Sequence, residues 1–312
     1  MSSKMRSRLV NDGTREPPKL RVFLNLDTLK DLRADSKWPG LDGPPLYEHL
    51  ARDGFEGVQF TSDAAVPAEV TLQFCGLDRI NTPQDAYTVA QKHAARGDRC
   101  ITVHAGWGIE DDDDAFRLVE AILAAGAQNN LPIFVETHRA TITQDIWRTV
   151  RIARKFPEIR FNGDFSHYYC GQELVYGDWA AKLDFMEPIF DRIGFLHGRI
   201  ASPGCMQVPI DADLSLSPRQ AHGSANYLEH FKELWIRAMT GFLRNADEGD
   251  VLIFAPELLS ASIYYARMFP DESGVLREES DRYEQAMLLK DLARLCFDRA
   301  TGSNGSAEPR RP

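Results

Sequence analysis

Four residues able to bind a metal ion stand at the ends of successive apolar segments of this chain. The segments PIFVE, IRFNGD, IGFLH and VLIFAPE deliver Glu136, Asp164, His197 and Glu257. The first two intervals, 28 and 33 residues, are about the length of one strand plus one helix. Three carboxylates and one imidazole that converge on one edge of a sheet are suitable ligands for a divalent metal ion. The sequence therefore predicts one metal site built from the ends of four consecutive strands.

These apolar segments belong to a regular alternation of strand-like and helix-like patterns. We expect eight strands, at 20–26, 57–60, 71–75, 100–105, 132–137, 159–164, 193–200 and 250–257. Helical patterns follow seven of them, at 44–53, 83–97, 113–129, 143–156, 178–191, 226–245 and 280–299. The alternation predicts a single-domain α/β fold, a (β/α)8 TIM barrel. An open doubly wound sheet is disfavoured because no Gly-rich GxGxxG turn follows the first strand.

The two ends of the chain and one long segment depart from this alternation. Residues 1–19 are predicted to be a flexible N-terminal lead-in, residues 20–299 the catalytic barrel, and residues 300–312 a disordered tail. The segment 201–225, which contains His222, has little regular pattern. Long irregular loops in a compact domain are usually functional, so we expect this segment to cover the active site.

Composition and charge limit the classes of function. The chain has 312 residues, a hydrophobic fraction of 43% and a formal net charge of −10, which favours a globular protein without a nucleic-acid partner. No apolar stretch resembles a signal peptide or reaches the roughly 18 residues of a membrane span, so no membrane partner is expected. The five cysteines are scattered and odd in number, which is typical of reduced thiols in the cytoplasm.

The strand-end motifs resemble the xylose isomerase-like TIM-barrel superfamily of sugar phosphate isomerases and epimerases, and most of all its ketose 3-epimerase branch. The matching residues are Glu136 in VETH, Asp164 in GDFSH, His197 in FLHGR and Glu257 in APE. In that branch these positions hold one divalent metal ion, and the histidine of an Asp-x-x-His motif, here His167, contacts the substrate. The branch usually has an arginine several residues after its strand-7 histidine. Here Arg199 follows by two residues, on the same strand face.

The resemblance implies a metal-dependent isomerase or epimerase that acts on a sugar or keto-polyol. Mn²⁺ or Mg²⁺ is the preferred ion, and one imidazole also allows Co²⁺, Fe²⁺ or Zn²⁺. The ion would stabilise the enediolate formed when a proton next to the carbonyl is removed. Glu136 and Glu257 would act as base and acid on the two faces of the substrate. Three carboxylates, a neutral His197 and a divalent ion would give the site a net charge of about −1.

Other residues near the strand ends are candidates for contacts with the substrate. They are His104, Trp107, His138, His167 and Arg199. His138 follows Glu136 by two residues and therefore shares its strand face, although a strand-end histidine is as often structural as functional. The expected partner is a small sugar-like substrate, and the resemblance implies a homodimer or homotetramer.

Three other functions are compatible with the same barrel. A lyase of the superfamily, similar to inosose dehydratases or to enzymes that eliminate from 3-keto-glycosides, would abstract the same proton and then expel a leaving group. An apurinic-site endonuclease would use further histidine ligands, such as His104, His138 and His167. The net negative charge of the chain disfavours a DNA-binding groove. A catalytically silent barrel is disfavoured because all four metal ligands are present. The choice between isomerase and lyase stays open.

Overall fold

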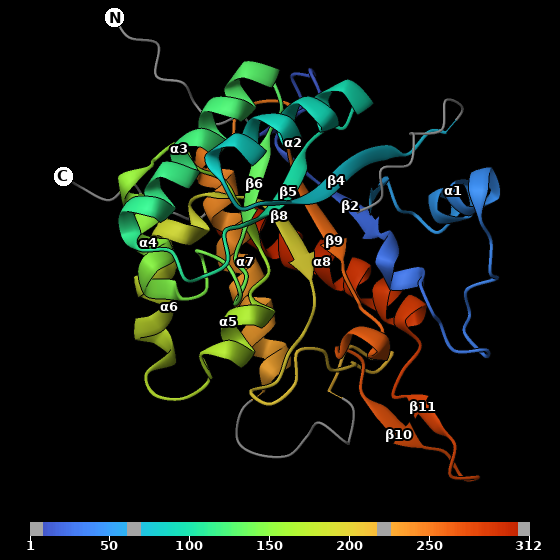
Figure 1. Ribbon diagram of the computed structural model, residues 1–312. Helices are drawn as coiled ribbons and strands as arrows, with labels where there is room; N and C mark the ends of the chain where they lie inside the picture. The colour runs from blue at the N-terminus through green and yellow to red at the C-terminus, as the bar shows by residue number, and fades with distance from the viewer. Residues whose placement is uncertain (1–8, 61–69, 217–225, 305–312) are drawn as a thin grey trace, which may run out of the picture.

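The computed structural model describes residues 9–60, 70–216 and 226–304, and most of these residues build one closed barrel (Figure 1). Parallel strands pair in chain order, and the last of them also pairs with the first, which closes the barrel. The eight strands are β2 (Lys19–Asn25), β3 (Gly57–Phe60), β4 (Gln73–Ile80), β5 (Ile101–Ala105), β6 (Ile133–Glu136), β7 (Phe161–Gly163), β8 (Ile193–Gly198) and β9 (Asp250–Pro256). The expected single-domain (β/α)8 TIM barrel is confirmed.

Helices connect the strands, and most of them cover the outer face of the barrel in Figure 1. They are α1 (Gly43–Arg52), α2 (Pro83–Arg96), α3 (Asp112–Asn129), α4 (Ile146–Lys155), α5 (Ser166–Gly171), α6 (Trp179–Phe190), α7 (Tyr227–Asn245) and α8 (Arg282–Asn304). Several begin at a side chain that accepts a hydrogen bond from a first-turn amide, which satisfies an otherwise unpaired donor. These capping residues are Thr82, Asp111, Asp145, Asp178 and Asn226.

Inside the barrel, alternate residues of the strands form layers of different polarity. The layer nearest the amino-terminal ends of the strands is an apolar cluster, the floor of the barrel, made of Val10, Phe23, Cys75, Cys100, Phe134, Phe195, Val251, Ile253 and Ala255. Above it lie the buried amide and hydroxyl side chains of Asn25, Gln59, Thr102 and Asn162. The acidic and histidine residues of the site lie above these, at the carboxyl ends of the strands. The apolar cluster fills the end of the barrel at which the strands begin, and the polar site residues lie at the other end.

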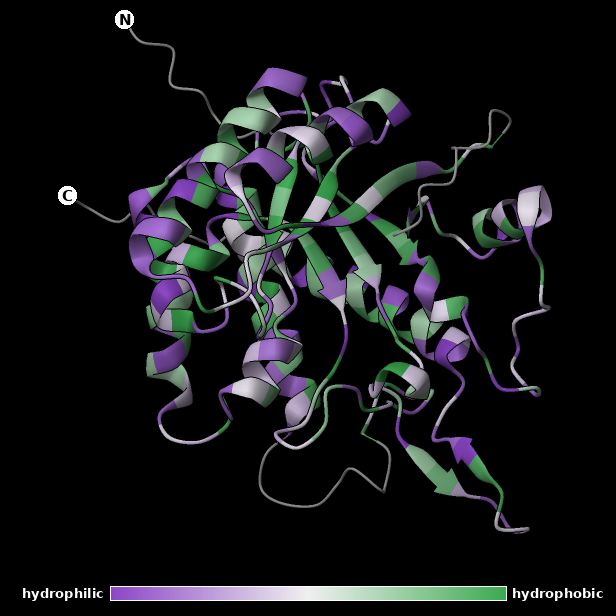
Figure 2. Ribbon diagram, viewed as in Figure 1, coloured by the Kyte–Doolittle hydropathy of each residue, from purple (hydrophilic) through white to green (hydrophobic). Residues whose placement is uncertain are grey.

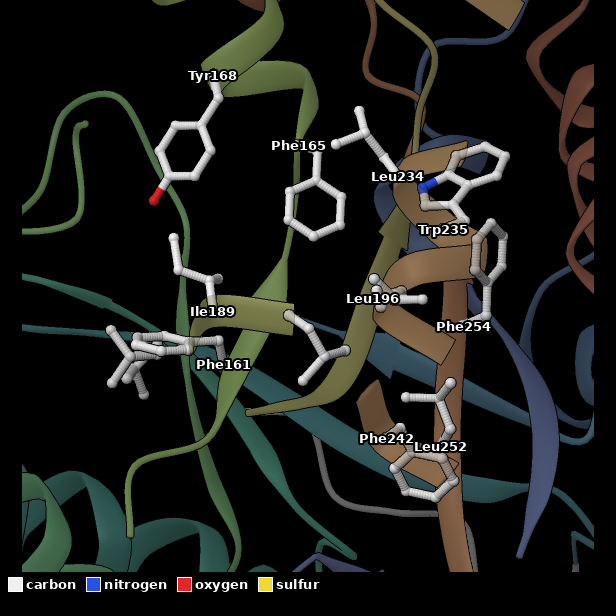
Figure 3. Close-up of a cluster of buried hydrophobic side chains, with 14 of the residues drawn as sticks. Phe161, Phe165, Tyr168, Ile189, Leu196, Leu234, Trp235, Phe242, Leu252 and Phe254 are labelled. Atoms are coloured by element: carbon white, nitrogen blue, oxygen red, sulfur yellow. The ribbon is translucent and has the colours of Figure 1, made fainter. Parts of the chain in front are cut away.

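A second apolar layer lies between the strands and the surrounding helices. Figure 3 shows part of this layer, where Trp235 of α7 lies beside Phe254 of β9, with Leu196 of β8 nearby. Figure 2 shows that hydrophobic residues are concentrated along the strands, whereas hydrophilic residues are frequent along the outer helices. Strands buried on both faces explain the nearly continuous apolar segments in the sequence.

The amino-terminal segment differs from the expected flexible lead-in where the structure describes it. Strand β1 (Val10–Asn11) pairs antiparallel with the start of β9. The Val10 side chain is buried and belongs to the apolar floor of the barrel. Val10 and Asn11 are therefore attached to the barrel, whereas residues 13–17 of the same segment are exposed. At the other end of the chain, α8 continues to Asn304 and includes the first residues of the expected tail, 300–312.

Other segments were not anticipated or are not described. A hairpin of β10 (Met268–Pro270) and β11 (Leu276–Glu278) follows β9 and projects from the barrel in Figure 1. Strand β4 continues to Ile80, beyond the expected end at residue 75. The segments outside the described residues are 1–8, 61–69, 217–225 and 305–312, so His222 and much of the expected loop over the active site are not placed.

Two further expectations concern membranes and cysteines. Among the helices within the described ranges, none is both long and apolar enough to cross a bilayer. All five cysteines are free thiols, in agreement with the expectation of reduced cysteines.

A buried charge network joins α2 to the segments around β4. His93 Nε2 lies 3.2 Å from Asp78 Oδ2, and His93 Nδ1 lies 2.5 Å from Asp98 Oδ2. Burial lowers the pKa of His93, but the hydrogen bonds with Asp78 and Asp98 outweigh burial and raise the pKa above 6.5. A histidine whose pKa is raised on folding stabilises the protein below its unfolded pKa. That contribution is lost as the pH rises through the folded pKa.

We therefore expect the His93→Gln variant to have a lower free energy of unfolding than the wild type. The loss should be largest in mildly acidic solution. The difference in free energy of unfolding should shrink as the pH rises above 6.5, since glutamine keeps hydrogen-bonding groups but does not titrate. Urea denaturation at a series of pH values measures this difference. A difference that does not change with pH would contradict the prediction.

Candidate metal centre

Three of the predicted ligands form a compact, buried group at the carboxyl end of the barrel. Glu136, Asp164 and His197 each offer one ligand atom, and these atoms lie within 4.8 Å of one another. The three residues are at most 1% exposed. Glu136 ends β6, Asp164 follows β7 and His197 lies on β8, so three neighbouring strands bring the group together. Carboxylate, carboxylate and imidazole are a donor set that suits a divalent metal ion.

The two oxygens of the Glu136 carboxylate face different partners. Oε1 lies 3.1 Å from His104 Nε2, whereas Oε2 accepts a hydrogen bond from Asn162 Nδ2 at 3.1 Å and lies 3.4 Å from His197 Nδ1. Burial would raise the pKa of Glu136, but the charge and hydrogen bond of the nearby His104 oppose burial, and the pKa lies well below its usual value. Glu136 is therefore ionised, the form in which a carboxylate binds metal.

Asp164 presents one oxygen without a hydrogen-bond partner to the same group. Its Oδ1 accepts hydrogen bonds from the backbone amide of Ser166, at 3.1 Å, and from the Ser166 hydroxyl. Its Oδ2 is buried and has no hydrogen-bond donor, although Arg199 Nη2 lies 3.0 Å away. The ion pair with Arg199 offsets part of the cost of burying this oxygen, and no hydrogen-bond donor occupies its lone pairs. The orphan oxygen fits the role of a metal ligand.

A chain of hydrogen bonds through the side-chain amides of Asn25 and Gln59 determines which ring nitrogen of His197 carries a proton. The backbone amide of Asp27 donates to Asn25 Oδ1, so Asn25 Nδ2 points the other way and donates to Gln59 Oε1. Gln59 Nε2 donates to Thr102 Oγ1, which leaves Gln59 Oε1 to face His197 Nε2 at 2.8 Å. Because this oxygen can only accept, His197 carries its proton on Nε2. The lone pair of Nδ1 is then directed at the carboxylates, as a metal ligand requires.

We expect the Gln59→Leu variant to bind Mn²⁺ about 10–100-fold more weakly than the wild type, since loss of an outer hydrogen-bond partner frees the ring of its ligand histidine. Isothermal titration calorimetry measures the affinity, and ¹⁵N chemical shifts of the His197 ring report which nitrogen is protonated. Gln59→Glu is the matched control because it keeps an acceptor oxygen and should keep Nε2 protonated. Unchanged affinity and tautomer in Gln59→Leu would contradict the role of Gln59.

Glu257, the fourth predicted ligand, lies beside the group but pairs with other residues. Its Oε2 lies 3.4 Å from His197 Nδ1, yet it accepts a hydrogen bond from Arg199 Nη2. Its Oε1 accepts from Asn25 Nδ2 at 2.9 Å. Burial raises the pKa of Glu257 and outweighs the opposite effects of His197 and Arg199. The two glutamates therefore differ, because the pKa of Glu136 is lowered while that of Glu257 is raised.

Three histidine rings pack against one another at tilted angles next to Glu136. The His138 ring centroid lies 4.3 Å from that of His104 and 4.0 Å from that of His167. Burial and the neighbouring His167 lower the pKa of His138 to about 2, and burial and Arg199 lower the pKa of His167 well below its usual value. Glu136 raises the pKa of His104 against the effect of burial. His138 and His167 are therefore neutral hydrogen-bonding groups.

His104, Glu136 and His138 are a second group with ligand atoms within 4.8 Å of one another. The Ala140 amide donates to His138 Nδ1 at 3.1 Å, which places the His138 proton on Nε2. In this tautomer neither ring nitrogen has a lone pair available for a metal ion. The hydrogen bond therefore favours a donor role for His138 and makes the group containing His197 the better candidate for a metal site.

At the rim of the site, Trp107 and Arg79 form a stacked pair. The Arg79 guanidinium lies 4.4 Å from the centre of the Trp107 ring, and this indole is 57% exposed. Arg79 is the register partner of His104, and side-by-side residues of parallel strands face the same way. The pair therefore lies on the same side of the sheet as the histidine cluster and can contact a substrate there.

Comparisons with known proteins identify the fold. No protein-family model and no curated protein matches this sequence. The structure is similar to that of a xylose isomerase-like TIM barrel protein from Mycobacterium smegmatis in complex with magnesium, with a TM-score of 0.52 and 11% sequence identity over 90% of this chain and 97% of that chain. This chain has the fold of a (β/α)8 TIM barrel. The fold expected from the strand-end motifs is confirmed.

Two other solved structures are similar at a lower level. One is the probable 3-DHS dehydratase AsbF from Bacillus anthracis, with a TM-score of 0.47 and 16% identity over 76% of this chain and 92% of that chain. The other is a xylose isomerase domain protein from Planctomyces limnophilus, with a TM-score of 0.44 and 11% identity over 93% of this chain and 97% of that chain. At such identities the similarity concerns the fold and not the reaction.

The barrel brings the predicted site residues to one end, and it adds some that the sequence had not indicated. His104, Glu136, His138, Asp164, His167, His197, Arg199 and Glu257 all lie there, with Trp107 at the rim. The unanticipated residues are Asn25, Gln59, Arg79, Thr102, Asn162 and Tyr265. Asn25 and Gln59 are polar residues inside apolar strand segments, a signal that could have indicated them.

Proposed function

We propose that this protein is a divalent-metal-dependent enzyme that removes a proton next to a carbonyl group of a sugar-like substrate, in the manner of an isomerase or epimerase. The observation that carries the proposal is the buried group of Glu136, Asp164 and His197 beside Glu257. The magnesium complex of the structurally similar protein from Mycobacterium smegmatis supports a divalent ion. An ion in this group would act as a Lewis acid that polarises the carbonyl group of the substrate.

The protein side chains divide the remaining tasks. The lowered pKa of Glu136 keeps its carboxylate ionised and able to accept a proton, whereas the raised pKa of Glu257 makes it the better proton donor of the two once it has taken up a proton. Environments that push the pKa values of two carboxyl groups apart are typical of paired acid and base residues. His138 Nε2–H and the partnerless buried Nδ1 of His167 are available to hydroxyl groups of the substrate.

Charge at the site favours an electrically neutral complex with the ion. Three carboxylates and a divalent ion alone would leave the site with a net charge of about −1. Arg199, which is 1% exposed and contacts both Asp164 and Glu257, supplies the missing positive charge. A buried site close to neutrality avoids the large cost of an uncompensated charge.

The proposal is tested by metal analysis and by solvent exchange. We expect one divalent ion per chain, and deuterium from D₂O in the carbon-bound position next to the carbonyl of a ketohexose or keto sugar acid from a test panel. The product mass separates the two reactions, since an isomerase keeps the mass apart from deuterium, whereas a lyase releases water or a glycosyl group. A wild-type protein that binds no divalent ion would overturn the proposal.

A further inference from the structure

One arginine at the site, Arg79, forms no ion pair with any carboxylate of the described residues. It lies near the end of β4 and is half-buried. Its Nη1 donates to the backbone oxygen of Gly106 at 2.7 Å and lies 3.4 Å from Asn81 Oδ1, and both of these partners are neutral. Burial lowers the pKa of Arg79 against the opposite effects of Glu110 and Glu136. Buried charges are normally paired, so this guanidinium lacks the partner expected for its burial.

The Arg79 side chain faces the metal centre. Arg79 is the register partner of His104, and His104 Nε2 lies 3.1 Å from Glu136 Oε1. Side-by-side residues of parallel strands point to the same face of the sheet. The charge of Arg79 opposes the rise in the pKa of His104, and Glu136 opposes the lowering of the pKa of Arg79. Arg79 therefore borders the space that a substrate of the metal centre would occupy.

One edge of the Arg79 guanidinium is open. Within the part of the chain that the structure describes, Nη1 has hydrogen-bond partners but Nε and Nη2 have none. Both open nitrogens are reached by solvent, unlike Arg199 Nη1, which is buried without a partner. Nε–H and Nη2–H lie on the same edge of the planar group, and their spacing matches the two oxygens of a carboxylate. The Trp107 ring, 4.4 Å away, stacks on the guanidinium and fixes its plane.

The turn after β5 occupies the groups that would compete for this edge or would favour a phosphate. The Glu110 carboxylate accepts hydrogen bonds from the backbone amides of Trp107 and Gly108, each at 2.7 Å, so both of its oxygens are bonded to the turn. The same two amides are therefore closed to a ligand. Phosphate sites commonly use several backbone amides, whereas a carboxylate needs only one guanidinium edge. The open edge of Arg79 therefore fits a carboxylate better than a phosphate.

We propose that Arg79 binds a carboxylate group of the substrate, which makes the substrate a keto sugar acid rather than a neutral sugar or a sugar phosphate. This inference rests on the proposed function. Arg199 does not fit this role because it is already paired with Asp164 and Glu257. Arg139 does not fit it either, because its side chain is exposed. A site built to pair with a charged group discriminates strongly against a ligand that lacks this group, since the protein charge is then left unpaired.

Matched pairs of ligands test the role of a carboxylate on the substrate. D-Fructose and D-tagatose are neutral, whereas D-fructuronate and D-tagaturonate carry a carboxylate in place of the terminal hydroxymethyl group. Isothermal titration calorimetry with the Mn²⁺-loaded protein measures the four affinities. We expect the wild type to bind at least one acid about 10–100-fold more tightly than its neutral counterpart, as for hydrogen bonds to a charged group. In Arg79→Gln the ratio of the two affinities should fall to within about 3-fold of unity.

The matched control is Arg154→Gln, which removes the same charge from an exposed arginine of α4. Arg154 also lies over an aromatic ring, that of Phe185, at 5.8 Å from its centre. This variant should keep the full preference for the acid. Arg79→Lys keeps the charge but loses the planar edge, so it should keep only part of the preference. A rise in the melting temperature on addition of Mn²⁺ shows that each variant is folded and still binds the ion.

The outcomes separate this inference from the proposed function. A wild-type protein that binds Mn²⁺ but prefers neither acid to its neutral counterpart would overturn the inference alone, and this comparison needs no variant. An Arg79→Gln variant that keeps the preference would do the same. Tighter binding of D-fructose 6-phosphate than of D-fructuronate would assign the Arg79 edge to a phosphate and would also overturn the inference. A wild-type protein that binds no Mn²⁺ would overturn the proposed function and, with it, the inference.

Discussion

The Glu136→Gln variant is expected to lose both metal binding and proton abstraction. Glu136 is 1% exposed, and its oxygens face His104 on one side and Asn162 and His197 on the other. Glutamine keeps the size of the side chain but removes the negative charge and places an amide group against donors. We expect Mn²⁺ affinity to fall by more than about 100-fold. Deuterium exchange into a keto-sugar should fall by at least about 10³-fold, as for loss of a catalytic base together with its metal.

The control for this experiment is Glu120→Gln, which makes the same chemical change at an exposed position of α3. This variant should bind Mn²⁺ and exchange deuterium like the wild type, so any effect of lowering the net negative charge of the protein is accounted for. Thermal unfolding with and without Mn²⁺ adds an independent readout, because an ion that binds only the folded state raises the melting temperature. Retention of an Mn²⁺-dependent rise in Glu136→Gln would show that Glu136 is no ligand.

The Trp235→Ala variant is expected to suffer the largest loss of stability. Trp235 is fully buried in α7, and its ring lies edge-on to Phe254 of β9 with 5.1 Å between ring centroids (Figure 3). The centroid of the Phe231 ring lies 5.8 Å from that of Trp235. Removal of a buried aromatic ring costs the transfer free energy of its atoms and leaves a cavity. We expect the free energy of unfolding to fall by about 3–5 kcal/mol, as measured by urea denaturation.

The matched control is Trp235→Phe, which keeps much of the aromatic volume. The Trp235 Nε1 donor is buried without a hydrogen-bond partner, so phenylalanine removes a polar group whose burial is unfavourable. The loss should therefore be much smaller than for alanine. Mn²⁺ affinity of the folded alanine variant should stay near that of the wild type, since Trp235 packs outside the barrel. A loss below about 1 kcal/mol for alanine would mean that the surrounding helices and strands close the cavity.

The sequence predicted the barrel and much of its site because both depend on local patterns. Parallel strands buried on both faces give apolar segments that stand out from the helical patterns around them. Their carboxyl ends lie at one end of the barrel, so a polar residue at the end of such a segment is a candidate for the site. This reasoning indicated Glu136, Asp164, His197 and Glu257 without any knowledge of contacts.

The same reasoning missed residues whose placement depends on longer or irregular segments. Strand β4 continues through a polar stretch to Ile80, and this extension places Arg79 beside His104. The end of a strand cannot be recognised from the sequence when its residues have no apolar pattern. Val10 was assigned to a flexible lead-in because a two-residue strand is too short to recognise, yet it seals the apolar floor of the barrel.

The sequence alone determined the type of fold and the acidic and histidine residues that meet at the end of the barrel. The partner of each residue was decided only by the tertiary structure. Glu136 and Glu257 look alike in sequence, but Glu136 lies among histidines while Glu257 lies between Asn25 and Arg199. Hydrogen bonds and charges within a few ångströms set the protonation and role of a carboxyl group, and such distances arise only when distant segments of the chain pack together.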